Sequence, residues 1–234
     1  MRKEYSKIQG TPSILWGEPS KKLYLFIHGQ GGCKEEAEHF AEIAGPRGWQ
    51  VLSIDLPEHG ERTQEKNTFD PWHAVPQLSV VMEYAQSHWD SIGLMANSIG
   101  AWFSMLSFAN EKLERCLFVS PILDMHRLIQ NMMVWANVTE DQLEKEQIIP
   151  TSFGQTLSWE YLSYVKEHPI TKWSFPTEIL YADKDHLTEP EVVKDFTKRF
   201  GCRLTVMERG EHWFHTPEQF KFLNKWVRDV FENK

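Results

Sequence analysis

Short runs of consecutive apolar residues alternate along the chain with stretches in which apolar residues recur every three or four positions. Runs of the first kind are typical of strands buried on both faces of a sheet, and the longer periodic stretches are typical of helices with one buried face. The runs predict strands at 23–28, 51–55, 92–96, 116–120, 178–182 and 203–208. Ahead of them, residues 8–17 hold two weaker runs broken by Gly10 and Pro12, for which we expect an antiparallel edge.

The periodic stretches predict helices between these strands, at 37–44, 71–89 and 192–200, and a last helix that begins after Thr216. Pro76 leaves the start of the second helix open, because a proline in a helix interior removes a hydrogen bond. Thr216 and Gln219 have the spacing of a capping box. Strands that alternate with helices predict an α/β protein, in which a mostly parallel sheet is flanked by helices on both faces.

One interval does not fit a single crossover. Residues 121–174 separate two predicted strands, and a structureless loop of that length is unusual in a compact domain. The interval contains helical patterns at 125–135, 139–147 and 158–167. We therefore predict one domain over residues 1–234, with residues 121–174 inserted as a helical cap over one edge of the sheet.

The charge balance excludes one class of partner. Lys and Arg number 25 against 33 Asp and Glu, a formal net charge of −8. A protein that binds phosphate backbones needs the opposite balance, so no nucleic acid is expected as a partner. The cysteines are Cys33, Cys116 and Cys202, and none lies in a CxxC motif, so neither a disulfide framework nor a zinc finger is indicated.

No membrane association is expected either. Residues 92–109 carry no charge, but glycine, asparagine and serine interrupt them, and a spanning helix needs about 20 predominantly apolar residues. The first residues, MRKEYSKIQG, have no apolar segment behind their charges that resembles a secretory signal. A cytoplasmic protein is the resulting expectation.

The sequence ANSIG at 96–100 stands where a predicted strand gives way to a helical stretch. A serine in a tight strand–turn–helix is exposed above the sheet, and small residues two positions before and after it let strand and helix approach. Ser98 is therefore a candidate nucleophile, and the backbone N–H of Ile99 is a candidate donor to an oxyanion. Alternatively, Ser98 only caps a core helix, since serine is a favoured N-cap.

A second motif, HGQGG at 28–32, directly follows a predicted strand. Three glycines in four positions let the backbone curve close to a ligand, and the amide of Gln30 is the predicted second oxyanion donor. A flexible turn or a phosphate-binding loop is the alternative. The pattern is not GxGxxG, and no Lys-Ser or Lys-Thr follows it, so nucleotide binding is not indicated.

Acids and histidines follow three other strands. Asp183 and Asp185 come after the strand at 178–182, where either could orient a histidine or serve as a turn residue, and Asp185 is favoured. Asp124 is a fallback acid. His212 is the candidate general base, with His215 as its rival. No third ligand accompanies this histidine pair, so we predict no metal and no other cofactor.

Ser98, Asp185 and His212 occur in the chain order serine, acid, histidine, each directly after a predicted strand. In this order and in its motifs, the sequence resembles the α/β-hydrolase superfamily from about Lys22 to Phe231. The resembling motifs are HGQGG, DLPEHG at 55–60 with Glu58 where glycine is common, ANSIG, ADKD at 182–185 and GEHW at 210–213. Ala96 and Ala182 replace glycines of the family pattern.

The resemblance implies a serine nucleophile, a histidine base, an aspartate that orients the histidine, and a cap that shapes the substrate pocket. It assigns the acid to Asp185 and favours His212 as the base. We interpret Asp55, in DLPEHG, as a structural residue that holds its turn near the histidine loop.

Aromatic and Met side chains in the predicted cap suit an adaptable apolar pocket. Trp135 and Trp159 of the cap, and Trp213 beside the predicted base, are candidate substrate-binding residues, although each could instead pack the cap onto the body. We expect a serine hydrolase that cleaves a small or medium acyl or aryl ester through an acyl-enzyme, with a small-molecule acyl substrate as its partner. The alternatives are a serine peptidase or amidase of the same fold and a catalytically silent ligand-binding protein. The sequence carries no indication of oligomeric state.

Overall fold

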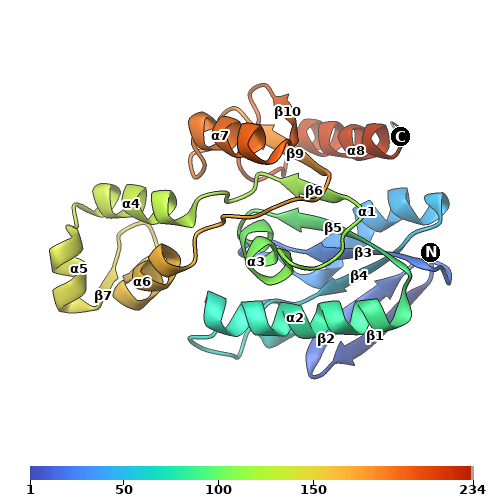
Figure 1. Cartoon of the computed structure of the whole chain (residues 1–234), viewed down its shortest axis with the longest axis horizontal. Helices are drawn as coiled ribbons and strands as arrows, with labels where there is room; N and C mark the ends of the chain where they lie inside the picture. The colour runs from blue at the N-terminus through green and yellow to red at the C-terminus, as the bar shows by residue number, and fades with distance from the viewer. Residues whose placement is uncertain (233–234) are drawn as a thin grey trace.

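The computed structural model describes residues 1–232, within which eight strands form one sheet in the order β1-β2-β4-β3-β5-β6-β9-β10 (Figure 1). The six strands from β4 to β10 in this order are parallel to one another, whereas β2 runs antiparallel to both β1 and β4. The strands are β1 (Lys3–Ile8), β2 (Thr11–Trp16), β3 (Lys22–Ile27), β4 (Gln50–Ile54), β5 (Ser91–Asn97), β6 (Cys116–Val119), β9 (Thr177–Ala182) and β10 (Arg203–Met207).

All six strands predicted from apolar runs are present, and their ends differ from the prediction by one residue at most. The antiparallel edge is also present, but it begins at Lys3 rather than in the segment 8–17. Five of the six residues of β1 are exposed, so no apolar pattern marks this strand. Its turn into β2 uses positive φ angles at Gln9 and Gly10.

Helices cover both faces of the sheet, as predicted. Helices α1 (Ala37–Ala44) and α8 (Pro217–Glu232) bury their apolar side chains in one core cluster with Tyr24 and Phe26 of β3. On the other face, α2 (Pro71–His88), α3 (Ile99–Phe108) and α7 (Pro190–Phe200) share a second cluster with Leu23 and Leu25 of the same strand. Successive residues of β3 therefore point into different cores, which explains why the whole strand is apolar.

Local sequence fixes where several helices begin. The Asp70 carboxylate accepts the N–H of His73 at 2.9 Å and caps α2, which continues through Pro76. Thr216 and Gln219 form the predicted reciprocal capping box, with distances of 3.1 and 3.2 Å. Short 3₁₀ turns lie at Lys34–Glu36, Gly45–Arg47 and Gly60–Arg62.

Among residues 1–232 no helix has the length and apolar character needed to cross a bilayer.

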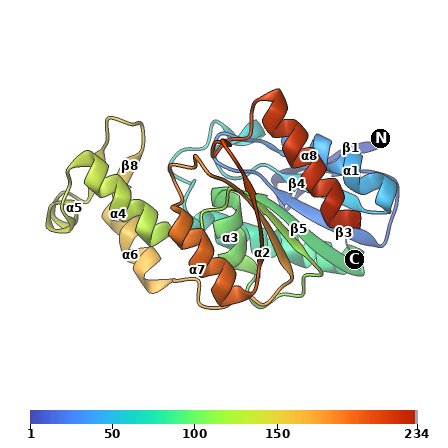
Figure 2. The ribbon, with the colours of Figure 1, turned by 90° about the horizontal axis from the view of Figure 1, so that it is seen from above.

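The chain leaves the sheet after β6 and returns at β9, and the segment between them projects beyond the strands (Figures 1 and 2). It contains α4 (Met125–Ala136), α5 (Glu140–Glu146) and α6 (Trp159–Glu167), at the places where helices were predicted. It also contains a hairpin, β7 (Ile148–Pro150) and β8 (Thr156–Ser158), for which the sequence analysis made no prediction. Strands of three residues are too short to produce a recognisable alternation. We call residues 121–174 the cap.

Candidate active site

Ser98 lies at the sharp turn between β5 and α3, with φ 50° and ψ −123°. This is a backbone conformation that side-chain-bearing residues rarely adopt, and it persists only where the surroundings impose it. Here the N–H of Ser98 donates to Val119 at 3.0 Å, and the carbonyl of Ser98 accepts the N–H of Ile122 at 3.1 Å. The Ser98 hydroxyl makes no capping bond to α3, so the side chain is free for another role.

Gly100 lets the turn pack this closely. A Cβ atom at this position would lie 2.3 Å from the carbonyl oxygen of His28 and 2.8 Å from that of Ile27. Gly29 also lies close to the turn, since a Cβ there would come 3.1 Å from the Cβ of Ser98. The β3 loop and the first turn of α3 therefore meet at Ser98.

Ser98, His212 and Asp185 form one hydrogen-bonded chain. The Oγ of Ser98 is 2.8 Å from Nε2 of His212, and Nδ1 of His212 is 2.7 Å from Oδ2 of Asp185. The other carboxylate oxygen of Asp185 accepts the N–H groups of Leu187 at 2.8 Å and Thr188 at 3.1 Å. The Asp185 side chain is fully buried, so its charge is held in one orientation toward the imidazole.

The rival residues lie elsewhere. Asp124 caps α4 by accepting the N–H of Arg127 at 2.9 Å, and Asp183 is exposed. His215 is also exposed, and its Nδ1 lies 2.7 Å from the carbonyl of Trp213. Among the described residues, no three His, Cys, Asp or Glu side chains are arranged to hold a metal ion.

Among residues 1–232, two backbone N–H groups have no protein acceptor: that of Ile99, which directly follows Ser98, and that of Gln30 in the loop after β3. Ile99 is the first residue of α3, where an N–H has no partner within the helix. Gln30 lies in a turn closed by a bond from the N–H of Gly32 to the carbonyl of Gly29 at 3.1 Å. The N–H of Gly31 donates to His59. The N–H of Gln30 makes no hydrogen bond within the described residues and could therefore donate to a ligand.

The Asp55 carboxylate bonds to its own turn and also to Lys34. It accepts the N–H of Lys34 at 2.9 Å, the ammonium of Lys34 at 2.8 Å and the N–H of Glu61 at 3.0 Å. It therefore holds its own turn at Glu61 and joins that turn to Lys34, at the end of the Gln30 loop. Burial tends to raise the pKa of Asp55, but the hydrogen bonds from Lys34 and Glu61 outweigh it and lower the pKa.

Sequence reasoning missed Lys34, because a lysine normally indicates a surface position. Its side chain is 2% exposed. Burial tends to lower the pKa of Lys34, but hydrogen bonds to Asp55, Glu61 and Glu35 outweigh it and raise the pKa. The pair is therefore charged in the folded protein.

His28, directly before the Gln30 loop, is fully buried. Its Nε2 accepts the N–H of Leu56 at 3.0 Å, and its Nδ1 lies 2.7 Å from the carbonyl of Gly29. Burial lowers its pKa to about 4. The ring is thus neutral at neutral pH and joins the loop after β3 to the loop after β4.

This burial predicts an acid-sensitive stability. The pKa of His28 is lower in the folded chain than the value of about 6.5 in an unfolded one, so the stabilisation is complete above pH 6.5. As the pH falls from 6.5 toward 4, the unfolded chain takes up a proton that the folded chain does not. At about 1.4 kcal/mol per pKa unit, the free energy of unfolding should fall by up to about 3 kcal/mol. Urea unfolding of wild type and His28→Gln across this range checks the prediction, because the variant curve should be flatter; equal slopes would contradict it.

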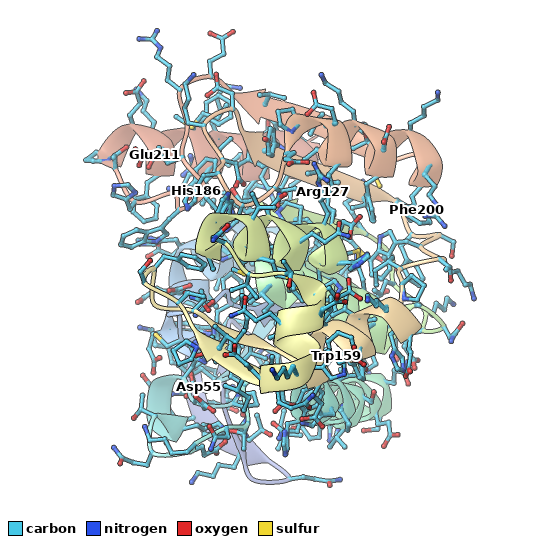
Figure 3. The ribbon with its side chains drawn as sticks, turned by 90° about the vertical axis from the view of Figure 1, so that its left-hand side faces the viewer. Asp55, Arg127, Trp159, His186, Phe200 and Glu211 are labelled. Carbon is cyan, nitrogen blue, oxygen red and sulfur yellow. The ribbon has the colours of Figure 1, made fainter. Side chains whose placement is uncertain are left out.

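The three tryptophans predicted to bind substrate differ in environment. Trp213 is 72% exposed and stacks on His215, with ring centroids 4.7 Å apart. Trp135 is 48% exposed and meets Phe153 of the cap hairpin edge-on at 5.9 Å. Trp159 packs against the core cluster that contains α2, α3 and α7, and the ammonium of Lys166 lies over its ring. In Figure 3, Glu211 and His186, sequence neighbours of the histidine and the acid, lie together, and Trp159 lies apart from them on the cap.

The comparisons with known proteins agree on the fold. The sequence matches no protein-family model and no curated protein. The structure is similar to a putative hydrolase from Agrobacterium vitis S4, 11% identical, with a TM-score of 0.78 and coverage of 98% of both chains. It is also similar to alpha/beta hydrolase domain-containing protein 10 from mouse, 12% identical, with a TM-score of 0.76 and coverage of 99% of both chains.

A third similar structure is Est1E from Butyrivibrio proteoclasticus, 17% identical, with a TM-score of 0.75 and coverage of 98% of this chain and 97% of that one. Est1E is also known in a structure with ferulic acid bound. These similarities extend over nearly the whole length of the chains. The protein therefore has the α/β-hydrolase fold, as the motifs predicted.

Proposed function

We propose that this protein is a serine hydrolase that cleaves a small or medium acyl or aryl ester through an acyl-enzyme. The observation that carries the proposal is the unbroken chain from the Oγ of Ser98 through His212 to the buried Asp185. A nucleophile, a base within hydrogen-bond reach and a third group that orients the base are the parts that nucleophilic catalysis needs.

In the proposed mechanism, Nε2 of His212 takes the proton of Ser98 as its oxygen attacks the ester carbonyl. Asp185 keeps Nδ1 protonated, so that Nε2 is the acceptor, and it stabilises the imidazolium that forms. The N–H groups of Gln30 and Ile99 donate to the oxyanion. His212 then gives its proton to the leaving alcohol. A water molecule, deprotonated by His212, attacks the acyl-enzyme, and the carboxylic acid leaves as Ser98 regains its proton.

The proposed substrate class rests on two supports. Exposed aromatic rings on the cap and on the histidine loop suit an apolar or aromatic substrate. Est1E, of similar structure, binds ferulic acid, which is an aromatic carboxylic acid and thus could form the acyl part of an ester.

A fluorophosphonate probe tests the proposal, because it reacts with an activated serine and leaves an ordinary one unmodified. We expect wild type to gain one label and Ser98→Ala to gain none. Ser107→Ala is the matched control, since Ser107 lies in α3 and donates to the carbonyl of Phe103. Failure of folded wild type to react would instead favour a catalytically silent ligand-binding protein.

Trp213 is proposed to contact the leaving group. His212 protonates the departing oxygen, so the alcohol part of the substrate lies beside His212, and Trp213 is the next residue. An aromatic pair contributes about 0.5–1.5 kcal/mol, so Trp213→Ala should lower kcat/KM for phenyl esters by about 2- to 10-fold. Methyl esters of the same acid should be unaffected, and so should the deacylation rate, because the alcohol has then departed. Tyr5→Ala, at an exposed residue of β1, is the control; equal losses for both esters would contradict the assignment.

A further inference from the structure

Two loops meet beside the proposed oxyanion site. One follows β3 and comprises residues 28–34; the other follows β4 and comprises residues 55–61. Three buried contacts join them at their bases, two between Lys34 and Asp55 and one from the N–H of Leu56 to His28. A fourth contact joins their tips, where the N–H of Gly31 donates to Nε2 of His59 at 2.9 Å.

The ring of His59 is fixed so that it can accept this bond. Its Nδ1 lies 2.7 Å from the carbonyl oxygen of Pro57, which can only accept, so Nδ1 carries the proton and Nε2 has a free lone pair. The ring also packs against Phe69, with centroids 4.4 Å apart, and against His28, with centroids 5.2 Å apart. His59 therefore presents a hydrogen-bond acceptor in one fixed direction.

The loop that His59 holds has little else to fix its tip. Gly31 is exposed and has φ +78°, and a Cβ at this residue would meet no atom within 4 Å. The bond from Gly32 to Gly29 closes the turn on itself but does not tie it to the rest of the protein. The bond to His59 is thus the contact that places the tip of this turn relative to the sheet.

We propose that His59 is a positioning residue for the oxyanion site, which acts by holding the Gly31 amide and thereby aiming the neighbouring N–H of Gln30. The inference rests on the proposed function, since it concerns the same reaction. Glycine backbone is intrinsically free to rotate, so without this acceptor the peptide of Gln30 samples orientations in which its N–H points away from Ser98. Such a loss weakens transition-state stabilisation and leaves ground-state binding intact.

Two substitutions separate the hydrogen bond from the shape of the ring. His59→Phe keeps the packing against Phe69 and removes the acceptor, whereas His59→Gln places an oxygen near the position of Nε2. His39→Phe, at an exposed histidine of α1, is the control. A misplacement of about 1 Å costs up to about 100-fold in rate, so we expect His59→Phe to lower kcat by about 10- to 100-fold with KM unchanged. We expect His59→Gln to recover most of the loss.

Two further measurements distinguish positioning from a general structural effect. Affinity for a boronic acid, which forms a tetrahedral adduct, should fall in His59→Phe by the same factor as kcat, while affinity for the planar product acid stays the same. Hydrogen exchange of the Gly31 amide, followed by NMR, should be faster in His59→Phe than in wild type. This last readout does not depend on catalysis.

The outcomes are separable. Unchanged exchange at Gly31 in His59→Phe would overturn the tether, and faster exchange with unchanged kcat would overturn the positioning role. Parallel losses of kcat, substrate affinity and thermal stability that His59→Gln does not relieve would mean a structural role only. A wild type that does not react with the fluorophosphonate would instead defeat the proposed function, and with it the positioning role, even where the exchange data support the tether.

Discussion

Replacing Ser98 with alanine is expected to reduce kcat for a chromogenic ester by roughly a million-fold, the loss found when a serine nucleophile is removed. The reason is geometric: Ser98 stands on a turn with a rarely adopted backbone conformation, and its Oγ lies 2.8 Å from Nε2 of His212, the proposed base. His212→Ala should cost a similar factor, and the double variant should be little worse than either single one, because the residues act as a unit. Steady-state kinetics with protein free of contaminating esterases provides the measurement.

Two observations would count against this expectation. One is a Ser98→Ala variant that turns over ester within about tenfold of wild type. The other is a double variant whose loss equals the product of the two single losses, since independent sites contribute additively in free energy. Ser107→Ala should retain wild-type kinetics in the same assay.

Replacing Gly100 with alanine is expected to destabilise the protein strongly. The new Cβ would lie 2.3 Å and 2.8 Å from two backbone carbonyl oxygens, and backbone atoms of a central strand cannot move aside cheaply. Overpacking a core typically costs about 1–3 kcal/mol, and a contact this short with backbone belongs at or above the upper end. Chemical denaturation should therefore show a loss of about 3 kcal/mol or more, together with a loss of activity as the turn that carries Ser98 moves.

Gly45→Ala provides the matched control. Gly45 follows α1 with φ −55°, and a Cβ there would meet no atom within 4 Å. This variant should lose far less stability than Gly100→Ala, because only the following Pro46 disfavours a side chain there, and it should be as active as wild type. If Gly100→Ala were as stable as Gly45→Ala, the close approach of α3 to β3 would be wrong.

The sequence predicted the sheet well because the central strands are buried on both faces. Such strands are apolar at every position, as in Leu23–Ile27, and their runs are hard to mistake. The three residues that form the hydrogen-bonded chain were also predictable, since each lies in the turn or loop after a strand and the carboxyl ends of parallel strands share one edge of the sheet. The order serine, acid, histidine then left few arrangements to consider.

Other features depend on contacts that no local pattern contains. The exposed strand β1 is held by pairing with β2, and the cap hairpin has strands of only three residues. Lys34 and His59 have residue types that are usually found at surfaces, and only the meeting of two loops after β3 and β4 gives them their partners. The ten tryptophans illustrate the same limit. Their number is evident from the sequence, but their exposure is not: in the folded chain Trp102 is 1% exposed and Trp213 is 72% exposed.

The central claim is that Ser98 carries the acyl group during turnover, and rapid-quench mass spectrometry tests it most directly. Wild type is mixed with excess ester, stopped in acid within milliseconds and digested, and the acylated peptide is sequenced. We predict one acyl group per chain at most, attached to Ser98, which forms before steady state and disappears as the substrate is consumed. Product formation with no adduct on Ser98 in protein quenched during turnover, or with the acyl group on another residue, would contradict the claim.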